Sequence, residues 1–198
     1  MSTTSRTLPL VVFALAAVAQ CVAPLAGVIG RERVARHGTS FRVRCDAPDP
    51  YDPFRGRFLA VRPEQTTVAA PAGMPVGEIV TAWGVLAVGD DGLARIERLE
   101  LAPSAGANVI RVRAVRHAGD RAQVRWPFDR FYLNERLAPE ADAVVARAVR
   151  ERRGPVGSVA ATAALPVAEF RLLDGRAVLV DVLLDGVSVR DLVKQGGR

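Results

Sequence analysis

The chain opens on a long apolar segment before it changes to short alternating runs. From Leu8 to Gly30 no residue is charged. In a helix, 23 residues span roughly 34 Å, which exceeds a hydrocarbon core of about 30 Å. We therefore expect a transmembrane anchor over residues 8–30, between an N-terminal tail, 1–7, and a juxtamembrane linker, 31–37.

Two alternatives to an anchor stay open. A secretory signal over residues 1–19 is indicated by Arg6, the apolar run after it, and the small residues of Ala17-Val18-Ala19. Against cleavage there, the apolar run continues to Ile29. A core helix of a water-soluble domain is the third interpretation.

Two arguments about the orientation of the span in the membrane disagree. Arg31, Arg33 and Arg36 follow it, whereas Arg6 and the amino terminus precede it. Counting basic residues places the downstream domain in the cytoplasm, yet a long domain is exported largely regardless of flanking charge.

Residues 38–188 carry a strand pattern, and we expect one mainly β domain of antiparallel hairpins. Phe41 to Cys45 alternates as a half-buried strand does, and Asp46 to Pro53 (DAPDPYDP) predicts a loop. Gly56 to Arg62 predicts a further strand, and Pro63 to Gly77 a linker with side chains too small to build core by itself.

Three hairpins are predicted where apolar runs flank turn residues, near Asp91, Gly119 and Asp174. The pattern also predicts one short helix over Pro139 to Arg150, with acidic residues in its first turn and basic residues in its last. Residues 189–198 are expected to form a tail.

Two stretches, 38–103 and 106–188, repeat three landmarks in the same order. They are Arg-Val-Arg at 42–44 and 111–113, Arg-Phe at 57–58 and 130–131, and Asp-Gly at 91–92 and 174–175. An internal duplication explains the shared order. The alternative, which the sequence leaves open, is that any Arg-rich hairpin protein produces such matches.

The composition leaves few of the residue types from which most catalytic sites are built. The net charge is +6, and the basic residues are nearly all arginine, with Lys194 the only lysine. Only two histidines and two cysteines occur, and no glycine-rich phosphate loop is present. We therefore predict no catalytic His site, no metal site and no cofactor. Cys45 is the only thiol of the expected domain.

The segment Gly56 to Pro63 (GRFLAVRP) resembles the signature of the bacterial GDYXXLXY family of membrane-anchored proteins. Gly56 matches, Phe58 stands for the first Tyr and Val61 for the Leu, whereas Arg57 replaces the acidic residue and Pro63 the last Tyr. The run from Arg130 to Glu135 is similar to the family's second aromatic segment. The resemblance implies an anchored, extracytoplasmic β-rich domain and supplies no enzyme activity to carry over to this chain.

Two functions are compatible with these residues. The first is a binding or assembly module in the cell envelope, held in the membrane through lipid contacts of its anchor and contacting another membrane protein. The expected motif and contact residues are Asp49, Asp52, Arg55, Gly56, Arg57, Phe58, Phe131, Tyr132 and Glu135. The alternative is an envelope hydrolase or processing enzyme whose carboxylates are Asp49, Asp52 and Glu135.

The remaining partner classes are not indicated by the sequence. Arginines and aromatic residues interleave most densely from Arg125 to Tyr132, where packing in a β core explains them better than stacked bases. We therefore predict no nucleic-acid partner, and no small-molecule ligand is identifiable. The three arginines after the span are placed to meet anionic lipid headgroups.

Overall fold

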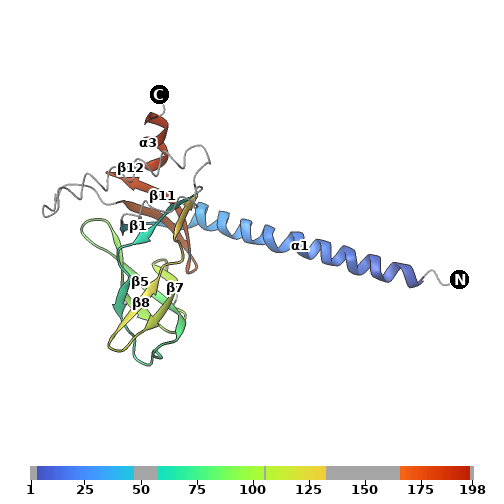
Figure 1. The fold of residues 1–198 in the computed structure, drawn as a ribbon, viewed down its shortest axis with the longest axis horizontal. Helices are drawn as coiled ribbons and strands as arrows, with labels where there is room; N and C mark the ends of the chain where they lie inside the picture. The colour runs from blue at the N-terminus through green and yellow to red at the C-terminus, as the bar shows by residue number, and fades with distance from the viewer. Residues whose placement is uncertain (1–3, 47–57, 105, 133–165, 197–198) are drawn as a thin grey trace.

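A computed structural model describes residues 4–46, 58–104, 106–132 and 166–196. One long helix, α1 (Thr4–His37), projects from a body of antiparallel sheets, as Figure 1 shows. Within it, the stretch Leu10–His37 is long and apolar enough to cross a membrane, and its apolar window is not buried. A core helix of a water-soluble domain buries such a face, so exposure argues against that interpretation.

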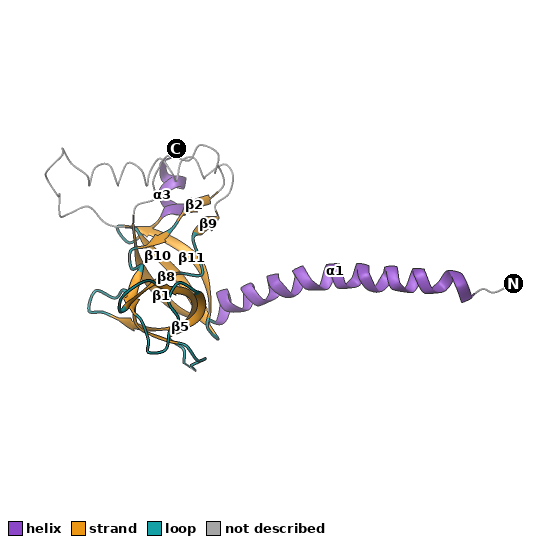
Figure 2. Cartoon of the chain, turned by 60° about the horizontal axis from the view of Figure 1, so that its bottom comes forward, coloured by secondary structure: helices purple, strands orange, loops and turns teal. Residues whose placement is uncertain are grey.

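The body contains two five-stranded sheets and a two-stranded one. The strands are β1 (Thr39–Asp46), β2 (Phe58–Ala60), β3 (Arg62–Pro63), β4 (Thr67–Ala69), β5 (Ile79–Val88), β6 (Ala94–Glu100), β7 (Val109–Arg116), β8 (Arg121–Arg125), β9 (Arg130–Tyr132), β10 (Val167–Leu173), β11 (Arg176–Leu184) and β12 (Val187–Ser188). We name the order β12-β11-β10-β1-β3 the first sheet and β4-β8-β7-β5-β6 the second sheet, while β2 pairs with β9. The predicted mainly β fold of antiparallel hairpins is confirmed (Figure 2).

All three predicted hairpins are present: β5–β6, β7–β8 and β10–β11. Asp174 and Gly175 both have positive φ, which suits the two-residue turn between β10 and β11. A further Asp-Gly, Asp185-Gly186, has the same conformation and turns β11 into β12.

The two large sheets share one arrangement. In each, a hairpin from one half of the chain pairs with the Arg-Val-Arg strand of the other half, β10–β11 with β1 and β5–β6 with β7. Each hairpin carries a bulge that leaves one residue unpaired, Glu97 and Val180, each the fifth residue after its Asp-Gly. Coincident strand order and bulge position favour the duplication over chance matches.

Helices lie where the sequence pattern did not place them. Helix α1 continues through residues 31–37, expected to be a linker, because Val34 is buried against the body and Arg36 pairs with Glu32 at 2.6 Å. Residues 189–196 form α3 (Val189–Gly196) instead of a tail, with Val189 fully buried. The helix expected over Pro139 to Arg150 lies outside the described residues.

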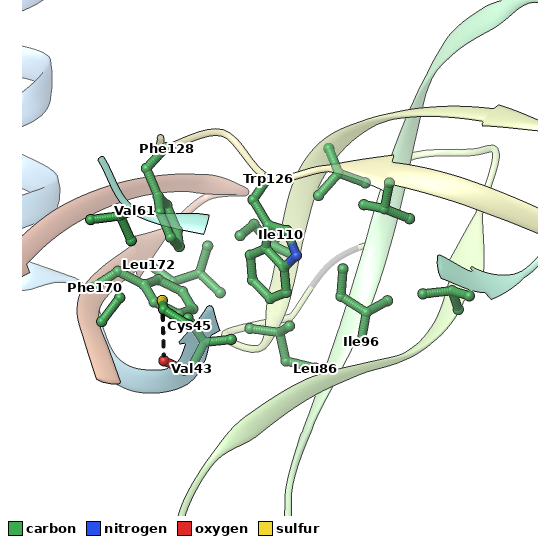
Figure 3. Packing of buried hydrophobic residues seen from close by; sticks show 14 of the residues in the cluster. Val43, Cys45, Val61, Leu86, Ile96, Ile110, Trp126, Phe128, Phe170 and Leu172 are labelled. Carbon is green, nitrogen blue, oxygen red and sulfur yellow. Dashed lines mark hydrogen bonds between the residues drawn. The ribbon is translucent and has the colours of Figure 1, made fainter. Parts of the chain in front are cut away.

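One core joins the two large sheets. Figure 3 shows Trp126 between Phe170 of the first sheet and Ile96 of the second. The stretch 63–77, expected to be a linker, also supplies this core, since Val68 and Met74 are buried. Cys45 is buried too, and burial raises the pKa of its thiol from 9.0 to about 12.

Candidate binding surface

The two-stranded sheet brings together the two segments singled out in the sequence. Phe58 is opposite Tyr132, Leu59 is opposite Phe131, and Ala60 is opposite Arg130. These strands lie 70 residues apart in the chain, so only the tertiary fold makes them neighbours. Phe58, Phe131 and Tyr132 therefore share one structural unit.

If the two halves of the chain are copies, β2 and β9 are equivalent strands, and their pairing should be symmetric about a two-fold axis. The observed register has this symmetry. If Phe58 corresponds to Phe131, then Leu59 corresponds to Tyr132. Exchanging the members of the pair Phe58–Tyr132 then gives Phe131–Leu59, which is the next pair observed. Such exchange is the property of an isologous contact. The repeated Arg-Phe segments thus pair with each other.

Phe131 anchors β9 to the body and is not exposed. Its side chain is 2% exposed, and the Arg190 guanidinium of α3 lies 4.8 Å from the ring centroid. Beyond β2, the Val61 amide donates a hydrogen bond to the Asp129 carbonyl at 2.9 Å. Phe131 is therefore packed inside the body. Sequence reasoning missed Arg190, which is 59 positions away.

One cavity lies beside this unit, and a second cavity adjoins the first. One, of about 600 Å³, is bounded by α1, the chain around Phe128 and β11, and Arg31, Arg130 and Arg176 line it. The other, of about 550 Å³, is lined by β7, the end of β8 and the start of β11. The two cavities share Pro127, Arg176 and Ala177.

A comparison with known protein families identifies the family of this chain. A family model with the description "GDYXXLXY protein" matches residues 20–182. The chain belongs to the GDYXXLXY family. The match begins inside α1 and ends inside β11, so it includes both strands of the two-stranded sheet. No curated protein and no solved structure matches the chain.

The described part of the GDYXXLXY signature, residues 58–63, is divided between two strands of different sheets. β2 ends at Ala60 and β3 begins at Arg62, so the strand predicted over Gly56 to Arg62 is interrupted at Val61, whose side chain is buried. Pro63, at the position of the family's last Tyr, is buried opposite Cys45. Val61 therefore lies between two strands and is not part of a continuous strand with period two.

The other expected contact residues of this GDYXXLXY protein lie outside the described residues: Asp49, Asp52, Arg55, Gly56, Arg57 and Glu135. In the ranges that the structure does describe, no group of three or more His, Cys, Asp or Glu side chains is placed to hold a metal ion. His117 is exposed, with its Nε2 3.3 Å from Gln123 Oε1.

Proposed function

We propose that this GDYXXLXY protein is a membrane-anchored assembly module whose β-rich domain lies in the periplasm and holds another membrane protein. Support for the anchor comes from α1, where large apolar side chains such as Leu10 (70% exposed) and Phe13 (73% exposed) have no protein packed on them. Exposed apolar faces of this size are found where lipid or protein covers them. Support for the periplasm comes from the family resemblance.

The pairing of β2 with β9 is the observation that carries the proposed contact. It joins the signature segment to the second aromatic segment in a small sheet separate from the two large ones. Within the described part of the chain neither strand has a second partner, so each presents an outer edge. Unpaired edges accept an added strand from another chain, with backbone groups giving affinity and side chains giving specificity.

The contact is tested by site-specific photocrosslinking in cells. A photoreactive residue at Arg55 or Tyr132 should capture the same polytopic membrane protein, and one at Arg98, on the exposed face of β6 in the second sheet, should not. No capture from the first two sites, with a hydrolytic activity that is lost in Asp52→Ala and Glu135→Ala, would establish the envelope hydrolase instead.

Anchorage and side are tested separately. The protein should remain in membranes after carbonate extraction, and a soluble mature form beginning at Gln20 would establish the secretory signal over 1–19. In intact cells whose outer membrane has been permeabilised, a membrane-impermeant maleimide should label Arg98→Cys. Labelling only after lysis would place the domain in the cytoplasm.

A further inference from the structure

The two Arg-Val-Arg runs have different electrostatic surroundings. In the first sheet, Arg42 Nε lies 3.1 Å from a carboxylate oxygen of Glu169. Arg44 of the same run lies 3.5 Å from Asp91 and 4.0 Å from Glu64. Each arginine of this run is therefore matched by at least one carboxylate.

The run in the second sheet has no such carboxylates. Among the described residues, neither Arg111 nor Arg113 has an ion pair or a side-chain hydrogen bond. Arg113 is also directly opposite Arg125 on β8. Like charges in directly opposed positions destabilise a sheet. An anion between the two guanidinium groups removes that cost.

These arginines share one cavity. Arg111, Arg113, Arg125 and Arg176 all line the 550 Å³ cavity, while Trp126 and Val112, both buried, form apolar parts of its wall. The corresponding cavity of the first half, about 370 Å³, is lined by Arg44, Arg95 and the carboxylate-bearing Glu64. Charge is thus balanced in one half and unbalanced in the other.

The unbalanced cavity connects to the place where α1 joins the body. Arg176 also lines the 600 Å³ cavity, together with Gly27, Gly30 and Arg31 of α1. A Cβ placed on Gly30 would lie 3.5 Å from Arg176 Nη1, so this guanidinium reaches the helix where the uncharged run ends. Figure 1 shows β7 on the side of the body from which α1 departs.

We propose that five arginines, Arg31, Arg111, Arg113, Arg125 and Arg176, form a binding site for the phosphate of an anionic phospholipid headgroup. We call these five the arginine band. A guanidinium presents parallel N–H donors that match phosphate oxygens. Lipid phosphates lie just outside the hydrocarbon core, where the uncharged run of an anchored α1 ends. The inference needs the anchor of the proposed function but not its protein partner or its side of the membrane.

Lipid binding to the purified full-length chain tests the arginine band. Phosphatidylglycerol and phosphatidylcholine are titrated separately into the protein in neutral detergent, and bound lipid is counted by native mass spectrometry. The variant is Arg111→Gln/Arg113→Gln, and the matched control is Arg42→Gln/Arg44→Gln, which removes two charges from the other Arg-Val-Arg run. Inorganic phosphate is titrated in a parallel measurement.

The wild type should bind phosphatidylglycerol in preference to phosphatidylcholine. Affinity for phosphatidylglycerol should fall by about fivefold per arginine removed, hence about 30-fold in Arg111→Gln/Arg113→Gln, and remain unchanged in the control. Arg176→Gln should lower it about fivefold. Equal binding of the two lipids, or equal losses in the two double variants, would overturn the proposal. Inorganic phosphate bound as tightly as the lipid would assign the site to a free phosphate ligand.

Failure of this test is distinguishable from failure of the proposed function. Loss of the anchor would appear in carbonate extraction, with the protein released from membranes. A protein that stays in the membrane but does not prefer phosphatidylglycerol overturns the arginine band alone.

Discussion

The first and second sheets share the order of four strands, β11-β10-β1-β3 and β6-β5-β7-β8, but contribute different side chains to the core. Leu179 and Ile96 are equivalent, because each is the fourth residue after the glycine of its Asp-Gly turn. Phe170 on β10 pairs with Leu179, and Leu86 on β5 pairs with Ile96, so Phe170 and Leu86 occupy equivalent positions. The ring of Phe170 lies 5.8 Å from that of Phe41, 5.1 Å from Phe128 and 6.1 Å from Trp126. The first sheet is therefore packed with aromatic residues where the second is aliphatic.

The residue at the centre of each sheet differs in size, and the residues paired with it differ in the opposite direction. Ala168 lies between Val43 and Val182 in the first sheet, and its counterpart Gly84 lies between Ile110 and Leu99 in the second. The smaller residue, Gly84, is flanked by the larger pair, Ile110 and Leu99, as close packing requires. The comparison teaches that the order of four strands and the position of the bulge are shared, whereas side chains diverge to give each sheet its own attachments. The first sheet carries α1, and in the part of the chain that the structure describes the Arg-Val-Arg run of the second sheet has no ion pair.

The largest expected effect concerns the aromatic centre. Phe170→Ala should lower the free energy of unfolding by about 3–5 kcal/mol, because it removes a fully buried ring contacting three others. Leu86→Ala should cost about 2–5 kcal/mol. Urea denaturation followed by tryptophan fluorescence measures both. If Leu86→Ala proves clearly the more costly, the aromatic side is not the centre of the core.

The second effect concerns the attachment of α1, which the second sheet lacks. A Cβ on Gly38 would lie 2.6 Å from the Val34 carbonyl oxygen and 2.9 Å from the Leu172 nitrogen, both backbone atoms. Gly38→Ala should therefore cost about 1–3 kcal/mol. Gly27→Ala is the matched control, since a Cβ there meets nothing within 4 Å. Equal denaturation midpoints for the two variants would contradict a tight junction.

The sequence predicted those parts of this comparison that depend on local signals. Asp-Gly turns and period-two alternation are local, so all three hairpins and β1 could be predicted from their own residues. The pairing of β1 with β10 and of β7 with β5 is set by tertiary packing, and no local pattern encodes it. The same holds for α3, whose first residue is fully buried in a core made elsewhere in the chain.

The candidate sites divide in the same way. The family signature identified Phe58 and Tyr132 as important, but not that they are opposite each other. The arginine band could not be predicted, because Arg31 and Arg176 lie 145 positions apart and meet only at the junction of α1 with β11. Its one sequence signal was the repeated Arg-Val-Arg, and the absence of matching carboxylates emerges only when strands are paired.

The third effect concerns Cys45, whose counterpart in the repeated pattern, Ala114, is also buried. Its thiol pKa is raised by burial to about 12, so at pH 8 the thiolate fraction should be about 1,000-fold lower than for a thiol with pKa 9.0. Alkylation in a Cys21→Ser background should be slow until the protein is denatured. Rapid alkylation of the folded protein would show that Cys45 is accessible.

The pH dependence follows from the same raised pKa. Because the folded state favours the neutral thiol, this contribution to stability is complete below pH 9 and decreases as pH rises toward about 12. Cys45→Ala, which copies Ala114, should cost about 1 kcal/mol or less at pH 7 and remove this contribution. A variant as sensitive as the wild type between pH 9 and 11 would assign the pH dependence to other groups.

The smallest effect directly compares the two Arg-Val-Arg runs. Arg42→Gln/Arg44→Gln removes exposed ion pairs and should lower stability by about 1 kcal/mol or less, because solvent screens such pairs. Arg111→Gln/Arg113→Gln removes a charge placed opposite Arg125 and should leave stability unchanged or raise it by a few tenths of a kcal/mol. The changes in the free energy of unfolding should have opposite signs in the two double variants at low salt, and they should converge as ionic strength rises. Thermal denaturation in lipid-free neutral detergent at two salt concentrations measures this difference. A loss of stability from the Arg111/Arg113 variant would mean that these arginines are already matched within the protein, and the case for an anion between them would fail.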